Sequence, residues 1–189
     1  MNELIDVGVI KLSDRAVVSD PCYDRSTWCM LTGVPVMPGE YKVYALLARK
    51  ATERPRVAGI ICYHCNSFTD LEQVVKQKWT KYDDFGVDSG QAGIFDDSIY
   101  PVSKDARGEY DDTSSFYGEC CHITLHSSCE CLASGKGIVT SSGYGDGFYR
   151  LRVIKQRELC CAMLLDFEIM SLIPALKNCV KQEDCKNDI

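Results

Sequence analysis

Four aspartates stand near glycine or proline at the expected ends of strands, and their carboxylates are suited to cation binding or proton transfer. They are Asp20, Asp88, Asp96 and Asp146. Glycine and proline allow close backbone approach and sharp turns, so carboxylates from separate loops can point into one cleft. Carboxylates a few ångströms apart either raise one another's pKa or bind a cation, and oxygen ligands suit Mg²⁺, Ca²⁺ or Mn²⁺. The pattern therefore indicates a divalent-cation site or an acid–base pair for hydrolysis, unless each aspartate only caps the amides of its own turn.

Other side chains in the same segments are suited to a small organic ligand. Tyr23, Trp28 and Tyr149 offer aromatic walls, and Gln91 offers a polar contact. Ligand pockets combine apolar surface with a few polar groups in this way, although the same aromatic residues also close hydrophobic cores. Together with the four aspartates, these four residues make up the predicted ligand-binding site.

Cysteine and histidine form a rival metal site. Cys62 and Cys65 flank His64, and His122 and His126 precede a second cysteine pair at 129 and 131. These are the soft ligands that hold tetrahedral zinc, but the spacing fits a zinc site only in part, because Cys62 ends an apolar strand. The cysteine doublets at 120–121 and 160–161 are expected to pack in the core. The identity of any metal or cofactor stays open at this stage.

Composition limits the class of protein. The chain has 189 residues, enough for one domain with its own core. Lys and Arg total 21 against 27 Asp and Glu, a net charge of −6, so nucleic acid is not an expected partner. The first residues lack the positive charge of a signal peptide, and no run of about 18 apolar residues occurs. We therefore expect a cytoplasmic protein that makes no membrane contact and keeps its twelve cysteines reduced.

Hydrophobic periodicity predicts mainly strands. A helix is expected at 70–79, capped by Thr69 or Asp70. The segment 111–125 is ambiguous, because residues 122–126 alternate like a strand, and it is interpreted as a helix capped by Asp112 or Ser114. A long loop is expected at 21–38, and a polar tail with a short fraying helix from residue 172. The expected strands are 4–10 paired with 16–19, a hairpin of 41–49 with 57–64, one strand at 85–95 interrupted by Gly90 and Gly93, and a final antiparallel run of 137–142, 148–155 and 159–168.

These elements indicate an α+β fold with a mainly antiparallel sheet, arranged as a sandwich or half-barrel, and one or two packed helices. Residues 1–170 are expected to form a single β-rich domain, and residues 171–189 a polar C-terminal tail. The glycine-rich segment 143–147 is interpreted as a tight turn, since it lacks the helix whose amide end would hold a phosphate.

Three segments carry a family resemblance: Ser19–Tyr23, Gly86–Asp96 and Ser142–Tyr149. Together with a Pro-Gly-x-Tyr entry to a strand at residues 38–41 and a closing Asp-Phe at 166–167, they resemble the uncharacterised family named domain of unknown function 4241. The resemblance covers about Val17 to Phe167 and departs from the family at Ser89 and in the cysteine-rich stretches. It implies a shared fold and core motifs, and it implies no activity, because the function of that family is not established.

Two classes of function fit these observations. The first is a binding domain that takes a small ligand or divalent cation at the aspartate- and glycine-rich cleft, with a metal-dependent hydrolase as a variant. The second is a protein-interaction factor, such as an immunity or anti-defence protein of a mobile element, that covers its partner with an acidic surface. The acidic segment Asp105–Asp112 is the candidate patch for that surface.

Overall fold

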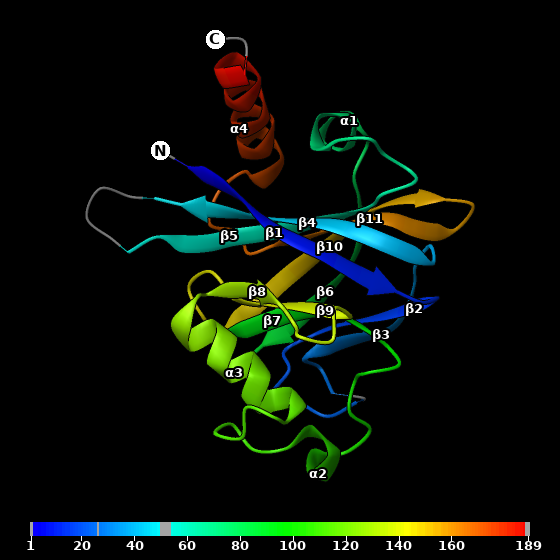
Figure 1. Ribbon diagram of the computed structural model, residues 1–189, viewed down its shortest axis with the longest axis vertical. Helices are drawn as coiled ribbons and strands as arrows, with labels where there is room; N and C mark the ends of the chain where they lie inside the picture. Colours follow the sequence, from blue (N-terminus) through cyan, green and yellow to red (C-terminus); the bar gives the residue numbers. More distant parts are fainter. Residues whose placement is uncertain (1, 26, 50–53, 188–189) are drawn as a thin grey trace.

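The protein is built on two antiparallel sheets (Figure 1), seen in a computed structural model that describes residues 2–25, 27–49 and 54–187. The six-stranded sheet has the order β1 (Glu3–Leu12), β4 (Gly39–Ala48), β5 (Arg56–His64), β11 (Leu159–Asp166), β10 (Gly147–Gln156) and β6 (Thr80–Val87). The five-stranded sheet has the order β3 (Met30–Pro35), β2 (Arg15–Ser19), β7 (Gln91–Asp96), β9 (Gly137–Ser141) and β8 (Cys129–Cys131). The helices of the described residues are α1 (Leu71–Lys76), α2 (Lys104–Arg107), α3 (Phe116–His126) and α4 (Leu172–Asn187).

One apolar core fills the space between the two sheets. Alternate residues of a strand point to opposite faces, so each strand contributes every second side chain to this core. Leu151 and Val153 of β10 and Ile60 of β5 meet Ile94 of β7 and Ile138 of β9 in one buried cluster. The expected α+β fold with antiparallel sheets is confirmed, and the two sheets form an open sandwich that does not close into a barrel.

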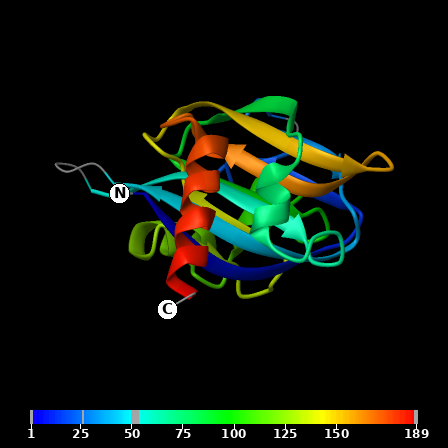
Figure 2. The same ribbon diagram turned by 90° about the horizontal axis from the view of Figure 1, so that it is seen from above.

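Helices cover the outer face of each sheet, which gives the molecule four layers (Figures 1 and 2). On the six-stranded sheet, Val74 of α1 and Leu176 of α4 pack against Leu164 of β11. On the five-stranded sheet, Ile123 of α3 packs against Phe95 of β7. No helix of the described part of the chain combines the length and apolar composition needed to cross a bilayer.

The prediction that residues 4–10 and 16–19 form a strand pair is wrong. β1 pairs with β4, whereas β2 pairs with β3 and β7, so the chain leaves one sheet and enters the other between them. At this corner the Ser13 amide donates to Asp96 at 2.5 Å, and the Asp14 carbonyl accepts from the Val36 amide at 3.0 Å. The polar residues 13–15 therefore mark a crossing between sheets and not a hairpin turn.

The prediction of one strand over 85–95 is also wrong, because β6 and β7 belong to different sheets. The chain crosses between them at residues 88–90, where Gly90 has a φ of +72° that other residues rarely adopt. The final run of strands is divided in the same way: β10 pairs with β11 as expected, but β9 lies in the five-stranded sheet. The expected loop at 21–38 contains the strand β3.

Several local predictions are confirmed. β4 and β5 form the expected antiparallel pair. α1 begins after Asp70, whose side chain accepts from the Gln73 amide, although the helix ends earlier than expected. In the ambiguous segment 111–125 the chain forms the helix α3, which begins only at Phe116 because Ser115 caps it in place of Asp112 or Ser114.

The C-terminal helix is longer than the short fraying helix that the sequence indicates. Leu172, Leu176 and Val180 recur at intervals of four residues, and all three are buried. This spacing places them on one face of α4, which covers the six-stranded sheet. The sequence of this segment indicates a polar tail because its charged residues outnumber the three residues of the apolar stripe.

Removal of one side chain tests this packing. Leu176 is 1% exposed, so Leu176→Ala is expected to lower the free energy of unfolding by roughly 2 to 5 kcal/mol, as buried Leu→Ala changes do. Lys177 is exposed on the same helix, and Lys177→Ala is the matched control with little expected effect. Urea unfolding monitored by circular dichroism measures both, and equal stabilities of the two variants would show that α4 does not pack on the sheet.

Candidate functional site

Asp20 is fully buried at the end of β2 and accepts four hydrogen bonds. One oxygen accepts from the Cys22 amide at 2.9 Å and the Ser89 hydroxyl at 2.6 Å. The other accepts from the amides of Asp88 at 2.9 Å and Ser89 at 2.7 Å. The carboxylate therefore joins the loop after β2 to the crossing between β6 and β7, and its geometry is that of a cap for turn amides.

Tyr23 and Asp88 extend this network to the surface. The Tyr23 hydroxyl donates to the exposed carboxylate of Asp88, and the Tyr100 hydroxyl donates to the Tyr23 carbonyl at 2.9 Å. The hydrogen bond to Asp88, together with burial, raises the pKa of the Tyr23 hydroxyl. Tyr23 thus stays protonated at neutral pH, and it holds Asp88 over the loop that Asp20 supports.

Gln91 lies next to this network and has an unpaired polar atom. Its side chain is 9% exposed, and its amide nitrogen donates to the Cys121 sulfur of α3 at 3.4 Å. Its oxygen Oε1 is buried and has no hydrogen-bond partner among the described residues. A buried acceptor without a donor costs about 1 to 3 kcal/mol, so this oxygen is available to a donor that enters the space beside it, a water molecule or a bound compound.

Gln91 lines a cleft of about 330 Å³, which we call the Gln91 cleft. Its other lining residues come from the crossing after β6, the end of β9 and one face of α3 with its preceding loop: Ser89, Gly90, Tyr110, Tyr117, Cys121, Thr124, Leu125 and Ser141. Ser89 connects the cleft to Asp20 directly. The Arg107 guanidinium lies 4.8 Å from the centre of the Tyr117 ring, which fixes that wall of the cleft.

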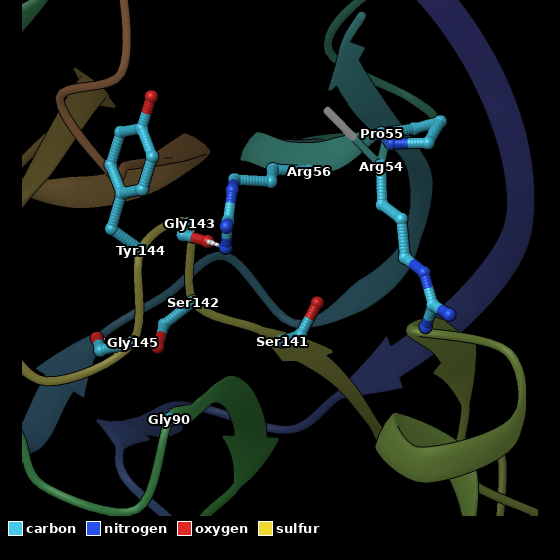
Figure 3. A pocket seen from close by; sticks show the side chains of 9 residues that line it. All are labelled: Arg54, Pro55, Arg56, Gly90, Ser141, Ser142, Gly143, Tyr144 and Gly145. Atoms are coloured by element: carbon cyan, nitrogen blue, oxygen red, sulfur yellow. Dashed lines mark hydrogen bonds between the residues drawn. The ribbon is translucent and has the colours of Figure 1, made fainter. Parts of the chain in front are cut away.

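A second cleft of about 330 Å³ adjoins the first, and we call it the arginine cleft (Figure 3). It is lined by Arg54, Pro55 and Arg56 on one side and by Gly90 and residues 141–145 on the other. Arg56 donates to the Gly143 carbonyl at 3.2 Å. Gly90 and Ser141 line both clefts, and the Ser142 amide donates to the Gly90 carbonyl at 2.9 Å in the backbone that the clefts share.

Asp96 lies at the far end of β7 from Gln91, about 17 Å away at the usual strand rise. It is buried, and it accepts from the Ser13 amide and from both the amide and the hydroxyl of Ser98. Burial alone would raise the pKa of this carboxyl, but the hydrogen bonds from Ser98 and Ser13 outweigh burial and lower it. Asp96 is thus a second cap at a crossing between sheets and is not part of either cleft.

Asp146, Tyr149 and Trp28 lie outside both clefts and outside the Asp20 network. Asp146 is exposed in the turn before β10. The Tyr149 hydroxyl donates to the carbonyls of Ser142 and Gly145, at 3.2 Å and 2.7 Å, and so holds that turn from inside. The Trp28 ring covers Gly86 so closely that an added Cβ would meet it at 1.9 Å.

The described residues contain no group of three or more His, Cys, Asp or Glu side chains placed to hold a metal. His64 uses both ring nitrogens, one facing the Ser67 hydroxyl at 3.0 Å and the other the Pro38 carbonyl at 3.1 Å. Eleven cysteines are described as free thiols. Of the eight predicted residues, Gln91 alone is among the described residues that line a cleft, while Asp20, Tyr23 and Asp88 form a hydrogen-bonded network that reaches the Gln91 cleft through Ser89.

Sequence reasoning missed the α3 wall and both arginines. Tyr117, Cys121 and Leu125 recur every four residues, which places them on one helix face, and Leu125 is 79% exposed there. This apolar stripe, which ends at an exposed residue, is the sequence pattern that could have predicted the wall. Arg54 and Arg56 carried no such signal, because the chain from residue 54 meets residues 141–145 only in the folded protein.

Comparison of the chain with protein-family models, curated proteins and solved structures finds no match. The resemblance to domain of unknown function 4241 stays a prediction.

Substitution of Asp20 tests its capping role. Asp20→Asn turns an amide NH₂ toward backbone donors, so we expect the free energy of unfolding to fall by about 2 kcal/mol or more. Asp146→Asn, at an exposed position, is the matched control and should leave stability within about 0.5 kcal/mol. Chemical unfolding at neutral pH measures both, and an Asp20→Asn variant as stable as the control would contradict the capping role.

Acid sensitivity tests the role of Asp96. Because its pKa is lower in the folded chain than in the unfolded chain, the ionised carboxylate stabilises the fold fully above the ordinary value of 3.8, and this contribution disappears as the pH falls through the lower folded value. Asp96→Asn should therefore be less stable than the wild type at neutral pH, and the difference should shrink under acid conditions. Unfolding curves at several pH values measure it; a difference independent of pH would argue against the ionised cap.

Proposed function

We propose that this protein is a binding domain for a small organic molecule, which it holds in the Gln91 cleft. The observation that carries the proposal is the buried Oε1 atom of Gln91, an acceptor without a protein donor that belongs to a residue lining the cleft. A ligand that donates a hydrogen bond from an N–H or O–H group would satisfy it. The volume of about 330 Å³ lies at the lower end of the range for ligand pockets.

The rest of the cleft supports the same class of ligand. Tyr117 and Leu125 supply apolar surface from α3, and burial raises the pKa of the Tyr117 hydroxyl, which therefore stays protonated and neutral. Asp20 fixes Ser89, and Arg107 fixes Tyr117, so two walls are held in place before any ligand arrives. Binding to a preformed site loses less conformational freedom, which favours affinity.

The interaction function is a second candidate, and one observation favours it. Trp28 is 53% exposed and Phe148 is 70% exposed, and their ring centroids lie 5.4 Å apart. Exposed aromatic pairs are typical of residues that anchor protein partners. This pair does not line either cleft, so a partner could dock there independently of the ligand site.

The variant Gln91→Met tests whether the Gln91 amide serves ligand binding or the stability of the fold. Methionine has a similar length and shape but no amide, so the variant should lose the ligand while the empty protein keeps its stability or gains about 1 kcal/mol. Gln156→Met, at an exposed position of β10, is the matched control.

The measurement has two parts. Native mass spectrometry of freshly purified protein detects a retained molecule, and a thermal-shift screen of small hydrogen-bond donors detects added ones. The proposal predicts a retained molecule or a stabilising compound for the wild type and Gln156→Met, and neither for Gln91→Met. Identical behaviour of all three proteins, or no ligand for any of them, would count against it.

A further inference from the structure

We propose that the ligand of the Gln91 cleft is an organic amine, whose ammonium group donates hydrogen bonds to side-chain oxygens that line the cleft. This inference rests on the proposed function and names the chemical class of the ligand. It starts from the hydrogen atoms of the lining residues. Three of the lining oxygens can accept a hydrogen bond but carry no hydrogen to donate to a ligand.

These three oxygens belong to Ser89, Thr124 and Gln91. The Ser89 hydroxyl donates its hydrogen to Asp20 at 2.6 Å, and the Thr124 hydroxyl donates its hydrogen to the Cys120 carbonyl at 3.0 Å. A hydroxyl has one hydrogen and two lone pairs, so both oxygens still accept after these bonds form. The Gln91 oxygen Oε1 has no hydrogen and no partner among the described residues. A donor group of the ligand therefore finds several acceptors, whereas a carboxylate finds no hydrogen on these oxygens.

The other hydroxyls of the cleft agree with a donating ligand. The Tyr117 hydroxyl is hydrogen-bonded to the thiols of Cys22 and Cys121, so the protein itself holds it in place. The hydroxyls of Tyr110 and Ser141 can turn their hydrogens away and accept as well. An ammonium group carries three hydrogens and no lone pair, so it is the donor that matches a lining rich in acceptors.

Electrostatics favours a donor with a positive charge. The nine lining residues include no Asp, Glu, Lys or Arg, so the charges just outside the cleft set its potential. The fully buried carboxylate of Asp20 lies 2.6 Å from the Ser89 oxygen and has no ion pair among the described residues. Asp88, next to Ser89, accepts from the Tyr23 hydroxyl and likewise has no cationic partner there. A positive ligand group would balance these two carboxylates.

The loop before α3 adds to the negative potential. Arg107 of this loop lies 4.8 Å from the centre of the Tyr117 ring and is not among the lining residues. Residues 104–112 nevertheless contain more acidic than basic side chains: Asp105, Glu109, Asp111 and Asp112 against Lys104 and Arg107. With Asp20 and Asp88, they give the surroundings of the cleft an excess of negative charge, as in the whole chain, and such an excess attracts cations.

The apolar part of the lining fits the body of an amine. Tyr110 is 65% exposed and Leu125 is 79% exposed, so both present apolar surface to a molecule that enters from solvent. The faces of tyrosine rings also attract ammonium groups, because the ring carries partial negative charge on its faces. The cleft therefore suits a compact amine with an aromatic or aliphatic body.

The test compares three probes of similar shape and different charge: benzylammonium, benzyl alcohol and benzoate. Each is titrated at neutral pH and constant ionic strength into ¹⁵N-labelled protein, and NMR follows the backbone amide of Ser89 and the side-chain amide of Gln91. Saturable shifts are expected for benzylammonium, with binding of benzyl alcohol weaker by about tenfold or more and binding of benzoate weaker still. Either of the other probes binding as tightly as benzylammonium, or no saturable binding of benzylammonium, would overturn the inference.

A pair of charge variants tests the electrostatic argument. Asp88→Asn removes one negative charge beside Ser89 at an exposed position, so benzylammonium should bind about threefold more weakly while binding of benzyl alcohol stays unchanged. Asp146→Asn removes the same charge from an exposed turn outside the cleft and is the matched control, with both probes binding as to the wild type. Equal weakening of the two probes by Asp88→Asn would show a structural effect and contradict the argument.

The same titration on Gln91→Met separates this inference from the proposed function. If Gln91→Met weakens all three probes but the wild type shows no preference for benzylammonium, the Gln91 cleft is a ligand site and the amine assignment alone is wrong. If benzylammonium binds Gln91→Met as tightly as the wild type, the proposed function is wrong, because the Gln91 amide then takes no part in binding.

Discussion

The carboxylate of Asp20 holds together the region on which both clefts depend. It stands at the end of β2 in one sheet, and three of its four hydrogen bonds go to Asp88 and Ser89, where the chain arrives from the other sheet. Backbone amides at such a crossing cannot join a strand ladder, and leaving them without acceptors would cost free energy. The buried Asp20 carboxylate accepts hydrogen bonds from two of these amides and from a hydroxyl. It thereby fixes the position at which β7 begins with Gln91.

Asp96 accepts hydrogen bonds from the chain at the other crossing between the sheets. The chain leaves β1 for β2 at Ser13, and the Asp96 carboxylate accepts from that amide and from Ser98. Two of the four aspartates that suggested cation chemistry are thus fixed caps at the corners of the sandwich. Their lone pairs are occupied by the chain itself, which explains why the motifs are clear in the sequence without forming a metal centre in the described residues.

The sequence predicts local structure better than pairing, for physical reasons. Apolar alternation identifies most strands and the Asp70 cap identifies α1, because both signals lie within a few residues. Strand pairing depends on contacts between residues that are distant in the sequence. The crossing at Ser13 therefore resembles a hairpin turn in the sequence, and the crossing at residues 88–90 resembles an interruption within one strand. The same limit applies to the candidate site. Asp20, Tyr23, Asp88 and Gln91 lie in segments with recognisable motifs, so the sequence identifies them. Arg54 and Arg56 belong to no motif, and only the fold places them opposite residues 141–145.

Gln91 is one of five described residues that have a buried polar side-chain atom without a hydrogen-bond partner, and it is the one that lines the Gln91 cleft. An apolar residue would complete this buried strand position between the sheet and α3, yet the chain places there an amide with only its nitrogen paired. Sequences that specify a fold tend to agree at every level, and they break local rules at functional sites, where binding offsets the loss of stability. Two residues that line the same cleft are themselves held in place, Ser89 by Asp20 and Tyr117 by Arg107. A hydrogen-bond donor bound in the cleft would pair this oxygen, and the proposed ligand site rests on that possibility.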